Sequence, residues 1–356
     1  MRIGLVIYGS LDTLSGGYLY DRKLVEYLRR QGDSVDVISL PWRNYAAHLA
    51  DNLRFKLPEN LDILIQDELN HPSLIVANRG KHPYPIISLV HHLRCSELRP
   101  KWQNAFYRVI EKKYLHSVDG FIINSKTTER VVNGFIEKRK PSIIAYPPTD
   151  RFGPPISEQE IIQRAHANSL RILFLGNVIE RKGLHTLLSA LLILQPSSFI
   201  LDVVGSLTSE LQYANQIQES IAANNLSSFV FLHGSLDKAP LIEKFDHAHV
   251  LVVPSSYEGF GIVYLEGMGF GLPAIGTSAG AAGEIIEHGK TGYLIAPDDS
   301  KSLAAHLQAL TDDRSLLTRL SLQARERYIR QPSWEETAKN IREFLYFMAN
   351  QAKLSQ

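Results

Sequence analysis

The sequence predicts an α/β protein made of two units, each built around a doubly wound parallel sheet. Short runs rich in Ile, Val and Leu alternate with longer amphipathic runs, as strands and helices do in such sheets. The alternation occurs twice, and a Pro-rich segment separates the two series. A chain of 356 residues is also long enough for two domains, at roughly 150 residues each.

The apolar runs of the first half show little polar alternation, which is typical of parallel strands covered on both faces. We expect strands at 2–8, 34–40, 61–66, 86–91, 120–125 and 142–146. Amphipathic segments predict helices at 17–31, 100–117 and 126–138. These elements form a predicted N-terminal domain of residues 1–150, on the acceptor side of the site discussed below.

Prolines at 147, 148, 154 and 155 interrupt regular structure, so residues 151–168 are predicted as a linker. The second series then predicts strands at 171–176, 199–205, 229–233, 249–254, 273–276 and 292–295. Its helices are expected at 184–194, 210–223, 240–245, 262–268 and 302–310. They form a second domain, 169–332, which is followed by a helix in 333–356 that Ser333 and Glu336 begin as a capping box.

Composition excludes several classes of protein. Apolar residues make up 44% of the chain and charged residues 21%, as in ordinary globular proteins. A single cysteine, Cys95, excludes an internal disulfide and a multi-cysteine zinc site. The net charge of +1 does not indicate nucleic-acid binding. Because neither a signal peptide nor a run of 18 apolar residues is found, we expect a cytoplasmic protein.

The glycine loops argue against two common nucleotide sites. The first turn, Gly9 to Gly17, lacks the G-x-G-x-x-G spacing of a dinucleotide site. Gly289-Lys290-Thr291 resembles the end of a P-loop, but Glu284 stands where the earlier glycine belongs, and the segment leads into a strand. An NAD enzyme and a P-loop ATPase are therefore disfavoured.

The loop after the strand at 249–254 carries the most informative pattern, Glu258-Gly259-Phe260-Gly261, with Glu266 eight positions after Glu258. Small residues at a helix entrance let an anionic ligand approach the backbone amides. On a continuous helix the two carboxylates would lie about 12 Å apart, too far for a glycosidase pair. The spacing instead suits two contacts along one long ligand. Glu266 could be a surface residue, but its apolar neighbours indicate a buried charge that needs a partner.

A second loop, which follows the strand at 171–176, supplies positive charge through Arg181 and Lys182. Ligands of open α/β sheets bind at such carboxyl ends of strands. The two cations could hold a pyrophosphate and neutralise the nucleotide as it leaves. A basic pair in a loop is commonly only solvated, so this interpretation depends on its combination with the Glu258 loop.

These segments together resemble family 4 glycosyltransferases, and the resemblance covers essentially the whole chain. The matching residues are Gly176, Arg181-Lys182-Gly183, Glu258-Gly259-Phe260-Gly261, Glu266, Gly283-Glu284 and Thr291-Gly292. The resemblance implies a GT-B fold, in which two Rossmann-like domains face a cleft and the last helix returns to the first domain. It also implies transfer of a hexose from a UDP- or GDP-sugar to a hydroxyl of a glycan or lipid-linked acceptor, with retention at the anomeric carbon. It implies no obligatory metal and no cofactor beyond the nucleotide diphosphate sugar as co-substrate.

Carried over by position, Glu258 would contact the hydroxyls of the donor sugar, Glu266 the ribose, and Arg181 with Lys182 the diphosphate. The resemblance also places Gly16 and Gly17 near the reacting phosphate and His91 near the donor sugar, with His92 as the alternative to His91. Catalytic residues would then be His91, Glu258, Arg181 and Lys182. The remaining predicted donor-binding residues are Gly176, Gly205, Gly234, Gly259, Phe260 and Gly261.

Two positions depart from the family pattern. Asn177 stands where many members have arginine, and the loop before Glu284 lacks the usual proline. Two other functions stay open: a GT-B sugar-nucleotide epimerase or hydrolase, and a non-catalytic nucleotide-sugar-binding protein.

Charge is concentrated in the first half of the chain. Residues 1–150 hold 21 basic and 16 acidic residues, and 94–140 alone hold 11 and 5. Within 99–114, Trp102, Phe106, Val109, Ile110 and Tyr114 fall near helical spacing beside Arg99, Lys101, Arg108, Lys112 and Lys113. The segment is either a helix that buries one face in its own domain, or a surface that contacts an anionic membrane peripherally at the inner face. No nucleic-acid partner is expected.

Overall fold

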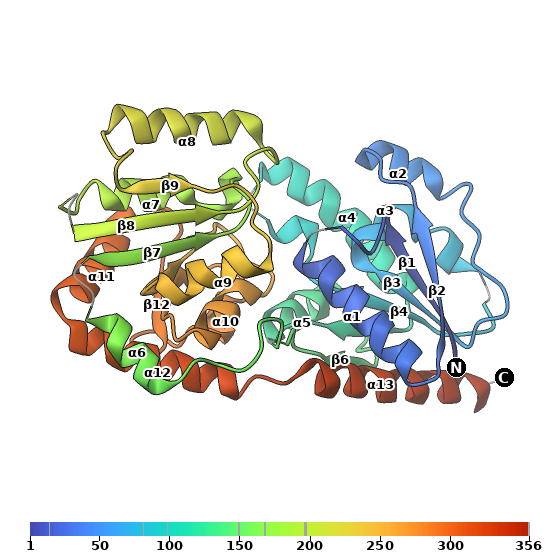
Figure 1. Ribbon diagram of the computed structural model, residues 1–356. Coiled ribbons are helices and arrows are strands. Elements are labelled where there is room, and N and C mark those ends of the chain that lie inside the picture. The colour runs from blue at the N-terminus through green and yellow to red at the C-terminus, as the bar shows by residue number, and fades with distance from the viewer. Residues whose placement is uncertain are drawn as a thin grey trace. The chain divides into compact units, whose positions relative to one another are not determined.

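The computed structural model describes residues 1–13, 15–80, 82–97, 99–148, 150–166, 169–195 and 198–354. The chain forms two compact units (Figure 1). The N-terminal unit consists of Met1–Pro148 and Pro332–Gln356, and the C-terminal unit consists of Thr149–Gln331. The chain therefore leaves the N-terminal unit and returns to it for the last helix.

Six parallel strands form the sheet of the N-terminal unit, in the order β2-β1-β3-β4-β5-β6. They are β1 (Arg2–Tyr8), β2 (Ser34–Leu40), β3 (Ile63–Asp67), β4 (Ile86–Val90), β5 (Gly120–Ile123) and β6 (Ser142–Ile144). The α-helices are α1 (Gly16–Arg30), α2 (Tyr45–Asp51), α3 (His71–Leu74), α4 (Lys101–Ser117), α5 (Lys126–Asn133) and α13 (Trp334–Leu354). Short 3-10 helices are η1 (Glu68–Asn70), η2 (Ala77–Arg79) and η3 (Arg94–Ser96).

Both faces of this sheet are covered, which explains the nearly continuous apolar strands. Leu5 and Ile7 pack into the cluster formed with α1 and α13. Val6, between them, points to the opposite face, where Tyr114 and Leu115 of α4 are buried. Alternate residues of one strand thus serve two hydrophobic layers.

The last helix belongs to the core of the N-terminal unit. The predicted capping box is present: the Glu336 amide donates to Ser333 Oγ at 3.2 Å, and the Ser333 amide donates to Glu336 Oε2 at 2.8 Å. Ile341, Leu345 and Met348 are buried in the cluster that also contains α1. These contacts hold α13 against the sheet of the first unit.

The C-terminal unit has a second sheet of six parallel strands, in the order β12-β11-β10-β7-β8-β9. They are β7 (Leu170–Leu175), β8 (Phe199–Val204), β9 (Val230–Leu232), β10 (Val250–Val252), β11 (Ala274–Thr277) and β12 (Gly292–Ile295). The α-helices are α6 (Glu158–Ala165), α7 (Leu184–Leu191), α8 (Leu211–Ala223), α9 (Lys238–His247), α10 (Ile262–Gly269), α11 (Ser300–Asp312) and α12 (Arg314–Ile329), and the 3-10 helices are η4 (Glu180–Lys182) and η6 (Ala282–Glu284).

Each strand expected from the sequence is present, with small shifts at its ends. The helices agree less well. The helix expected at 126–138 ends at Asn133, because the chain turns at Gly134, whose amide bonds back to the Arg130 and Val131 carbonyls. Helices α2, α3, α6 and α12 were not expected.

The segment 151–168, predicted as a linker, contains α6 within its described residues and is part of the C-terminal unit. Ser157 and Glu160 form a capping box that begins α6 directly after the prolines. The Ile156 amide donates to the Gly269 carbonyl, and Arg164 Nη2 donates to the Phe270 carbonyl at 2.6 Å. The helix is therefore fixed to the body of that unit. Among the described residues, no helix is long and apolar enough to span a bilayer.

Candidate functional site

The site predicted in the second half lies where the strand order of its sheet reverses. Strands β7 and β10 are neighbours, but the next strands along the chain, β8 and β11, lie on opposite sides of this pair. The loops after β7 and β10 therefore diverge, and such switch points are where open α/β sheets bind ligands. The loop after β7 carries Arg181 and Lys182, and the loop after β10 carries Glu258.

Gly183 allows the two loops to touch. Its φ of +71° is in the left-handed region, and a β-carbon there would lie 2.2 Å from the carbonyl oxygen of Pro254. Beside this contact, the Ser256 amide donates to the Arg181 carbonyl at 2.8 Å. These two contacts hold the turn η4 against the loop that follows β10.

This contact assembles a compact charged cluster, which we call the Glu258 cluster: Arg181, Lys182, Ser255 and Glu258. Lys182 Nζ forms an ion pair with Glu258 Oε1 at 2.5 Å, and Ser255 Oγ donates to the same oxygen at 2.6 Å. Arg181 Nη1 lies 4.0 Å from that oxygen and donates to the Tyr257 carbonyl at 2.8 Å. The structure therefore brings together three residues that the sequence placed in two separate motifs.

The electrostatics of Glu258 follow from this arrangement. The residue is 7% exposed, and burial alone would raise the pKa of its carboxyl group. The charges of Lys182 and Arg181 and the hydrogen bonds from Lys182 and Ser255 outweigh burial and lower the pKa below its usual value. Glu258 is therefore an ionised hydrogen-bond acceptor at neutral pH.

The helix after this loop begins at an unusual backbone position. Gly261 is the N-cap of α10 with a φ of +88°, and a β-carbon there would lie 2.6 Å from the Tyr264 ring. The carbonyl of Glu258 also accepts from the Ala281 amide, and Gly280 lies directly against it. Phe260 is buried at 5% exposure. The backbone at this helix entrance is thus fixed from two sides.

Glu266, in the middle of α10, has a partner that the sequence did not identify. Arg151 Nη1 lies 3.1 Å from Glu266 Oε1, and the guanidinium packs over the Phe152 ring. Burial raises the pKa of the Glu266 carboxyl group, and Arg151 offsets part of that rise. The apolar neighbours of Glu266 were a signal that it needs a partner, but a partner 115 residues away gives no sequence pattern.

The three predicted glycines Gly176, Gly205 and Gly234 follow β7, β8 and β9 and are neighbours. A β-carbon on Gly205 would lie 2.0 Å from the Gly176 carbonyl oxygen, and the Gly205 amide donates to the Gly234 carbonyl at 2.9 Å. Asn177, one of the two departures from the family pattern, accepts the Ser206 amide at 3.3 Å through Oδ1. It helps to hold these strand ends together.

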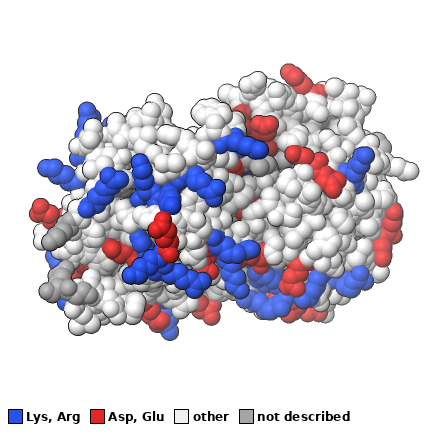
Figure 2. All heavy atoms as spheres, turned by 180° about the vertical axis from the view of Figure 1, so that it is seen from behind, with Lys and Arg blue, Asp and Glu red and all other residues white. Residues whose placement is uncertain are grey.

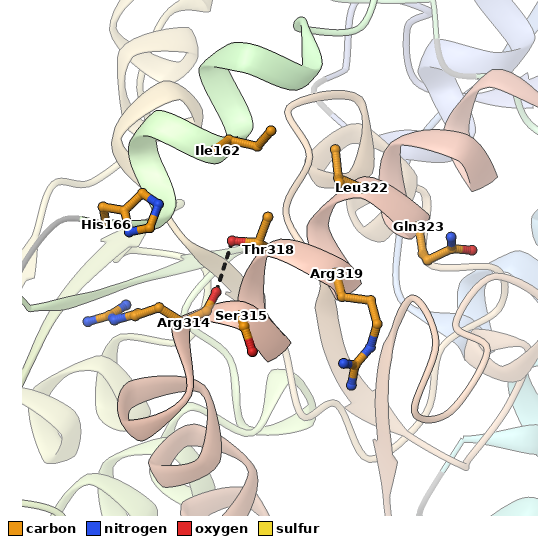
Figure 3. A pocket seen from close by; sticks show the side chains of 8 residues that line it. All are labelled: Ile162, His166, Arg314, Ser315, Thr318, Arg319, Leu322 and Gln323. Carbon is orange, nitrogen blue, oxygen red and sulfur yellow. Dashed lines mark hydrogen bonds between the residues drawn. The ribbon is translucent and has the colours of Figure 1, made fainter.

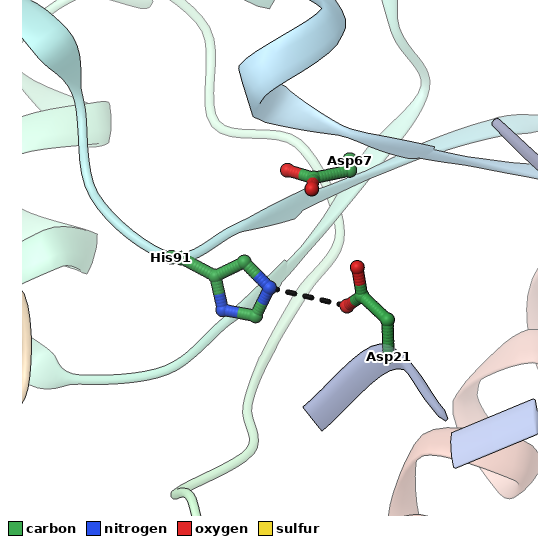
Figure 4. A group of neighbouring side chains, drawn as sticks. All are labelled: Asp21, Asp67 and His91. Carbon is green, nitrogen blue, oxygen red and sulfur yellow. Dashed lines mark hydrogen bonds and ion pairs between the residues drawn. The ribbon is translucent and has the colours of Figure 1, made fainter. Parts of the chain in front are cut away.

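In the N-terminal unit, the predicted residues also lie at a switch point, the one between β1 and β3. Gly16 and Gly17 form the first turn of α1, after the N-cap Ser15. A β-carbon on Gly17 would be 3.3 Å from the His91 ring. His91 Nε2 is 3.1 Å from Asp21 Oδ1, and Figure 4 shows the His91 ring directed at Asp21, with Asp67 beside the pair. His92 instead pairs with Glu97 at 2.9 Å, so the two histidines are held by different carboxylates.

Helix α4 divides the apolar residues of segment 99–114 between two faces. Tyr114 is fully buried, and Ile110 packs against the same cluster. Trp102, Phe106 and Val109 are 72%, 46% and 53% exposed. Lys101, Arg108, Lys112 and Lys113 are exposed around them. Figure 2 shows several groups of basic side chains on the part of the surface that belongs to the N-terminal unit.

A pocket of about 440 Å³ lies apart from all the predicted residues, between α6 and α12 (Figure 3). Its lining is Ile162, His166, Arg314, Ser315, Thr318, Arg319, Leu322 and Gln323. The pocket is a hollow of the C-terminal unit whose lining contains no acidic residue. No sequence pattern indicated this pocket, because the helix α12, which lines most of it, was not expected.

Comparison with known proteins agrees with this fold. Residues 157–327 match the family model described as glycosyl transferases group 1. The fold is GT-B. The structure resembles sucrose-phosphate synthase from Thermosynechococcus elongatus, with a TM-score of 0.81 and 21% identity over 100% of both chains. It also resembles HepE of Anabaena in complex with UDP-glucose, with a TM-score of 0.76 and 17% identity over 97% of this chain and 99% of that one.

Several sequence relatives are named as glycosyltransferases. A glycogen synthase of Mycobacterium tuberculosis (strain CDC 1551 / Oshkosh) is 28% identical over 205 residues, which cover 53% of this chain and 49% of the relative. The D-rhamnosyltransferase WbpZ of Pseudomonas aeruginosa is 28% identical over 266 residues, 69% of this chain and 67% of that protein. The match thus spans about half of the glycogen synthase and about two thirds of WbpZ.

Proposed function

We propose that this protein is a retaining glycosyltransferase of family 4, which transfers a hexose from a UDP- or GDP-sugar to a hydroxyl of a glycan or lipid-linked acceptor. The observation that carries the proposal is the Glu258 cluster. It combines two cations with a buried carboxylate at the switch point of a GT-B sheet, where a sugar diphosphate needs both kinds of contact. The glycosyltransferase relatives support the reaction class.

The donor would bind along the strand ends of the C-terminal unit. The side chain of Arg181 is 34% exposed, so a diphosphate reaches it more readily than it reaches Lys182. Lys182 would contact the diphosphate once its ion pair with Glu258 rearranges. Glu258, held ionised, would accept hydrogen bonds from sugar hydroxyls. Glu266 would accept from the ribose hydroxyls, exchanging its contact with Arg151 for the nucleoside.

The proposed chemistry is a front-face displacement. The bond between the anomeric carbon and the diphosphate oxygen breaks while a bond to the acceptor oxygen forms on the same face. The acceptor proton passes to the leaving diphosphate, so no protein base is needed. The protein positions the two reactants and stabilises the charge that develops on the diphosphate. Because Arg181 and Lys182 supply that stabilisation, we expect transfer to continue in the presence of EDTA.

One experiment separates this function from its two alternatives. Purified protein is screened against UDP, GDP and ADP by thermal shift, and the matching nucleotide sugars are then incubated with and without acceptor pools. Transfer to an acceptor with an unchanged anomeric configuration, read by NMR, supports the proposal. Free sugar or an epimer formed without acceptor would favour an epimerase or hydrolase. Nucleotide binding without turnover on any pool would favour a non-catalytic binding protein.

We also propose that α4 contacts an anionic membrane, which would suit a lipid-linked acceptor. Trp102, Phe106 and Val109 lie on one exposed face, since residues spaced by four and three positions share a side of a helix. The basic residues Lys101, Arg108, Lys112 and Lys113 flank that face. Exposed aromatic residues beside lysine and arginine are the pattern of interfacial helices.

Co-sedimentation with vesicles tests the membrane contact. The wild type should bind vesicles containing anionic lipid at low salt and bind them less at high salt, because charge attraction is screened. Trp102→Ser with Phe106→Ser should weaken binding at both salt concentrations. The matched control, Leu211→Ser, removes an apolar side chain that is 61% exposed on α8 and should have no effect. Equal and negligible binding to anionic and neutral vesicles would contradict the proposal.

A further inference from the structure

Two buried aspartates and a histidine meet at the switch point of the N-terminal sheet (Figure 4). Asp21 comes from α1, Asp67 is the last residue of β3, and His91 follows β4. Their ligand-type atoms all lie within 4.8 Å of one another. Neither aspartate was singled out in the sequence, because Asp21 lies within a predicted amphipathic helix and Asp67 follows an apolar run.

The His91 ring is held in one orientation by its neighbours. Nε2 faces Asp21 Oδ1 at 3.1 Å, and the Tyr20 ring packs edge-on at 5.4 Å between centroids. The close approach of Gly17 closes a third side. The backbone is also fixed, since Asn124 Nδ2 donates to the His91 carbonyl at 2.6 Å. Within the residues that the structure describes, Nδ1 has no protein partner, and the side chain is 17% exposed.

The charges around the ring favour its protonated form. Burial by itself would lower the pKa of the His91 imidazole, but the hydrogen bond and charge of Asp21 and the charges of Asp67 and Glu68 raise it to about 9. Burial and the nearby charge of Asp21 in turn raise the pKa of the Asp67 carboxyl group. Tyr18 and Tyr20, two further titratable residues of α1, stay neutral because burial raises their pKa.

Asp21 also has an unmet need. Its side chain is fully buried, and among the described residues its second oxygen, Oδ2, has no hydrogen-bond partner. An ionised carboxylate in that position requires a nearby positive charge. The His91 ring, whose Nε2 lies 3.1 Å from Asp21 Oδ1, can supply that charge, so the two residues depend on each other.

We propose that Asp21 and Asp67 are positioning residues that hold His91 as an imidazolium, with Nε2–H directed at Asp21 and Nδ1–H free to donate a hydrogen bond to an oxygen of the bound donor sugar. That the accepting oxygen belongs to a donor sugar rests on the proposed function. The protonation state of the His91 ring does not depend on it. His91 then acts as a donor and takes no proton from the acceptor, because both ring nitrogens already carry one.

The state of the ring is measured without any substrate. NMR of protein labelled with ¹⁵N in its 13 histidines reports the protonation of each ring nitrogen, and His91→Gln assigns the signal. In the wild type, both His91 nitrogens should be protonated at pH 7.5 and titrate near pH 9. In Asp21→Asn the midpoint should fall toward the ordinary value of about 6.5, and in Asp67→Asn it should fall less. The matched control is Glu97→Gln, which removes the carboxylate of the other histidine pair and should leave His91 unchanged.

A wild-type midpoint near 6.5, or no change in Asp21→Asn, would overturn the proposal. The three side chains also have the composition of a small metal site, and a stoichiometric change in the His91 nitrogen signals on adding Zn²⁺ or Mn²⁺ would overturn it as well, since a metal displaces the Nε2 proton.

The pH profile of transfer supplies the functional arm. Asp21→Asn should lower kcat about 10-fold or more and move the alkaline limb of the profile to lower pH, whereas a structural role alone would leave that limb in place. If the NMR titrations agree with the prediction but no transfer is detected, only the proposed function is contradicted. An unaltered alkaline limb in an active Asp21→Asn variant would count against the role of the ring.

Discussion

Gly183 lies so close to the Pro254 carbonyl that a β-carbon on it would be 2.2 Å from the oxygen. This contact is what allows the turn of Arg181 and Lys182 to lie against the strand end that leads to Glu258. The geometry of the Glu258 cluster therefore depends on Gly183, which has no side chain to contribute to it.

We expect Gly183→Ala to lower stability and donor binding together, because the turn must move away from β10. The matched control is Gly289→Ala, where φ is +75° but nothing lies within 4 Å of the added carbon. Both variants carry the cost of about 1–2 kcal/mol for a left-handed alanine, and only Gly183→Ala adds a clash. Chemical denaturation and nucleotide titration measure the two effects. Equal losses in both variants would show that the contact with Pro254 is unimportant.

The pair Lys182–Glu258 should be essential for transfer. Glu258→Gln keeps the shape but removes the charge that Lys182 requires, and we expect kcat/KM to fall by about 100-fold or more. Loss of one partner from a largely buried pair should also cost about 3 kcal/mol of unfolding free energy. Lys290→Met, which breaks the exposed pair with Glu287, is the control and should change neither quantity. Near wild-type transfer rates in Glu258→Gln with saturating donor would contradict the assignment of the donor site to the Glu258 cluster.

Glu266 should recognise the ribose of the donor nucleotide. We expect the wild type to bind the ribonucleoside diphosphate more tightly than its 2′-deoxy form, and Glu266→Gln to lose most of that discrimination. A hydrogen bond to a charged group contributes about 1.5–3 kcal/mol, so the ratio should fall by about 10-fold or more. Calorimetric titration with both nucleotides gives this ratio. If Glu266→Gln keeps the wild-type ratio, the carboxylate only serves as the partner of Arg151.

Asp33 should make stability depend on pH in the acid range. Burial would raise the pKa of its carboxyl group, but contacts with Arg342 at 2.6 Å, Tyr346 and the Met1 amino group lower it. A carboxyl group with a lowered pKa stabilises the fold above its unfolded pKa of about 3.9, and this contribution is lost as pH falls through the folded pKa. Asp33→Asn should therefore cost about 2 kcal/mol at pH 7 and much less near pH 2. Urea denaturation at both pH values measures the difference, and an equal cost at each would contradict this explanation.

Strands were the most predictable part of the fold, because buried parallel strands are apolar throughout and the chain repeats that pattern twice. Helix α12 was missed because only Asp313 separates it from α11, so no glycine or proline marks the boundary between the two helices. The Arg181 and Glu258 loops were singled out because glycines and charged residues follow the ends of two apolar strands.

The partners of site residues could not be predicted in the same way. Arg151 and Asp21 lie 115 and 70 positions in the sequence from the residues they contact, and only the tertiary fold brings each pair together. Segment 99–114 shows a similar limit: its apolar residues are consistent with one stripe, and only the packing of Tyr114 and Ile110 divides it into a buried and an exposed face.

The return of the chain to the N-terminal unit for α13 has a consequence for biosynthesis. The ribosome delivers all six strands of that unit early, but Ile341, Leu345 and Met348, which cover one face of them, emerge only after the whole C-terminal unit. The C-terminal unit can therefore complete its core before the N-terminal unit does, and until α13 is synthesised the N-terminal unit keeps an uncovered apolar surface. Nascent chains stalled before residue 332 should be the species that chaperones capture.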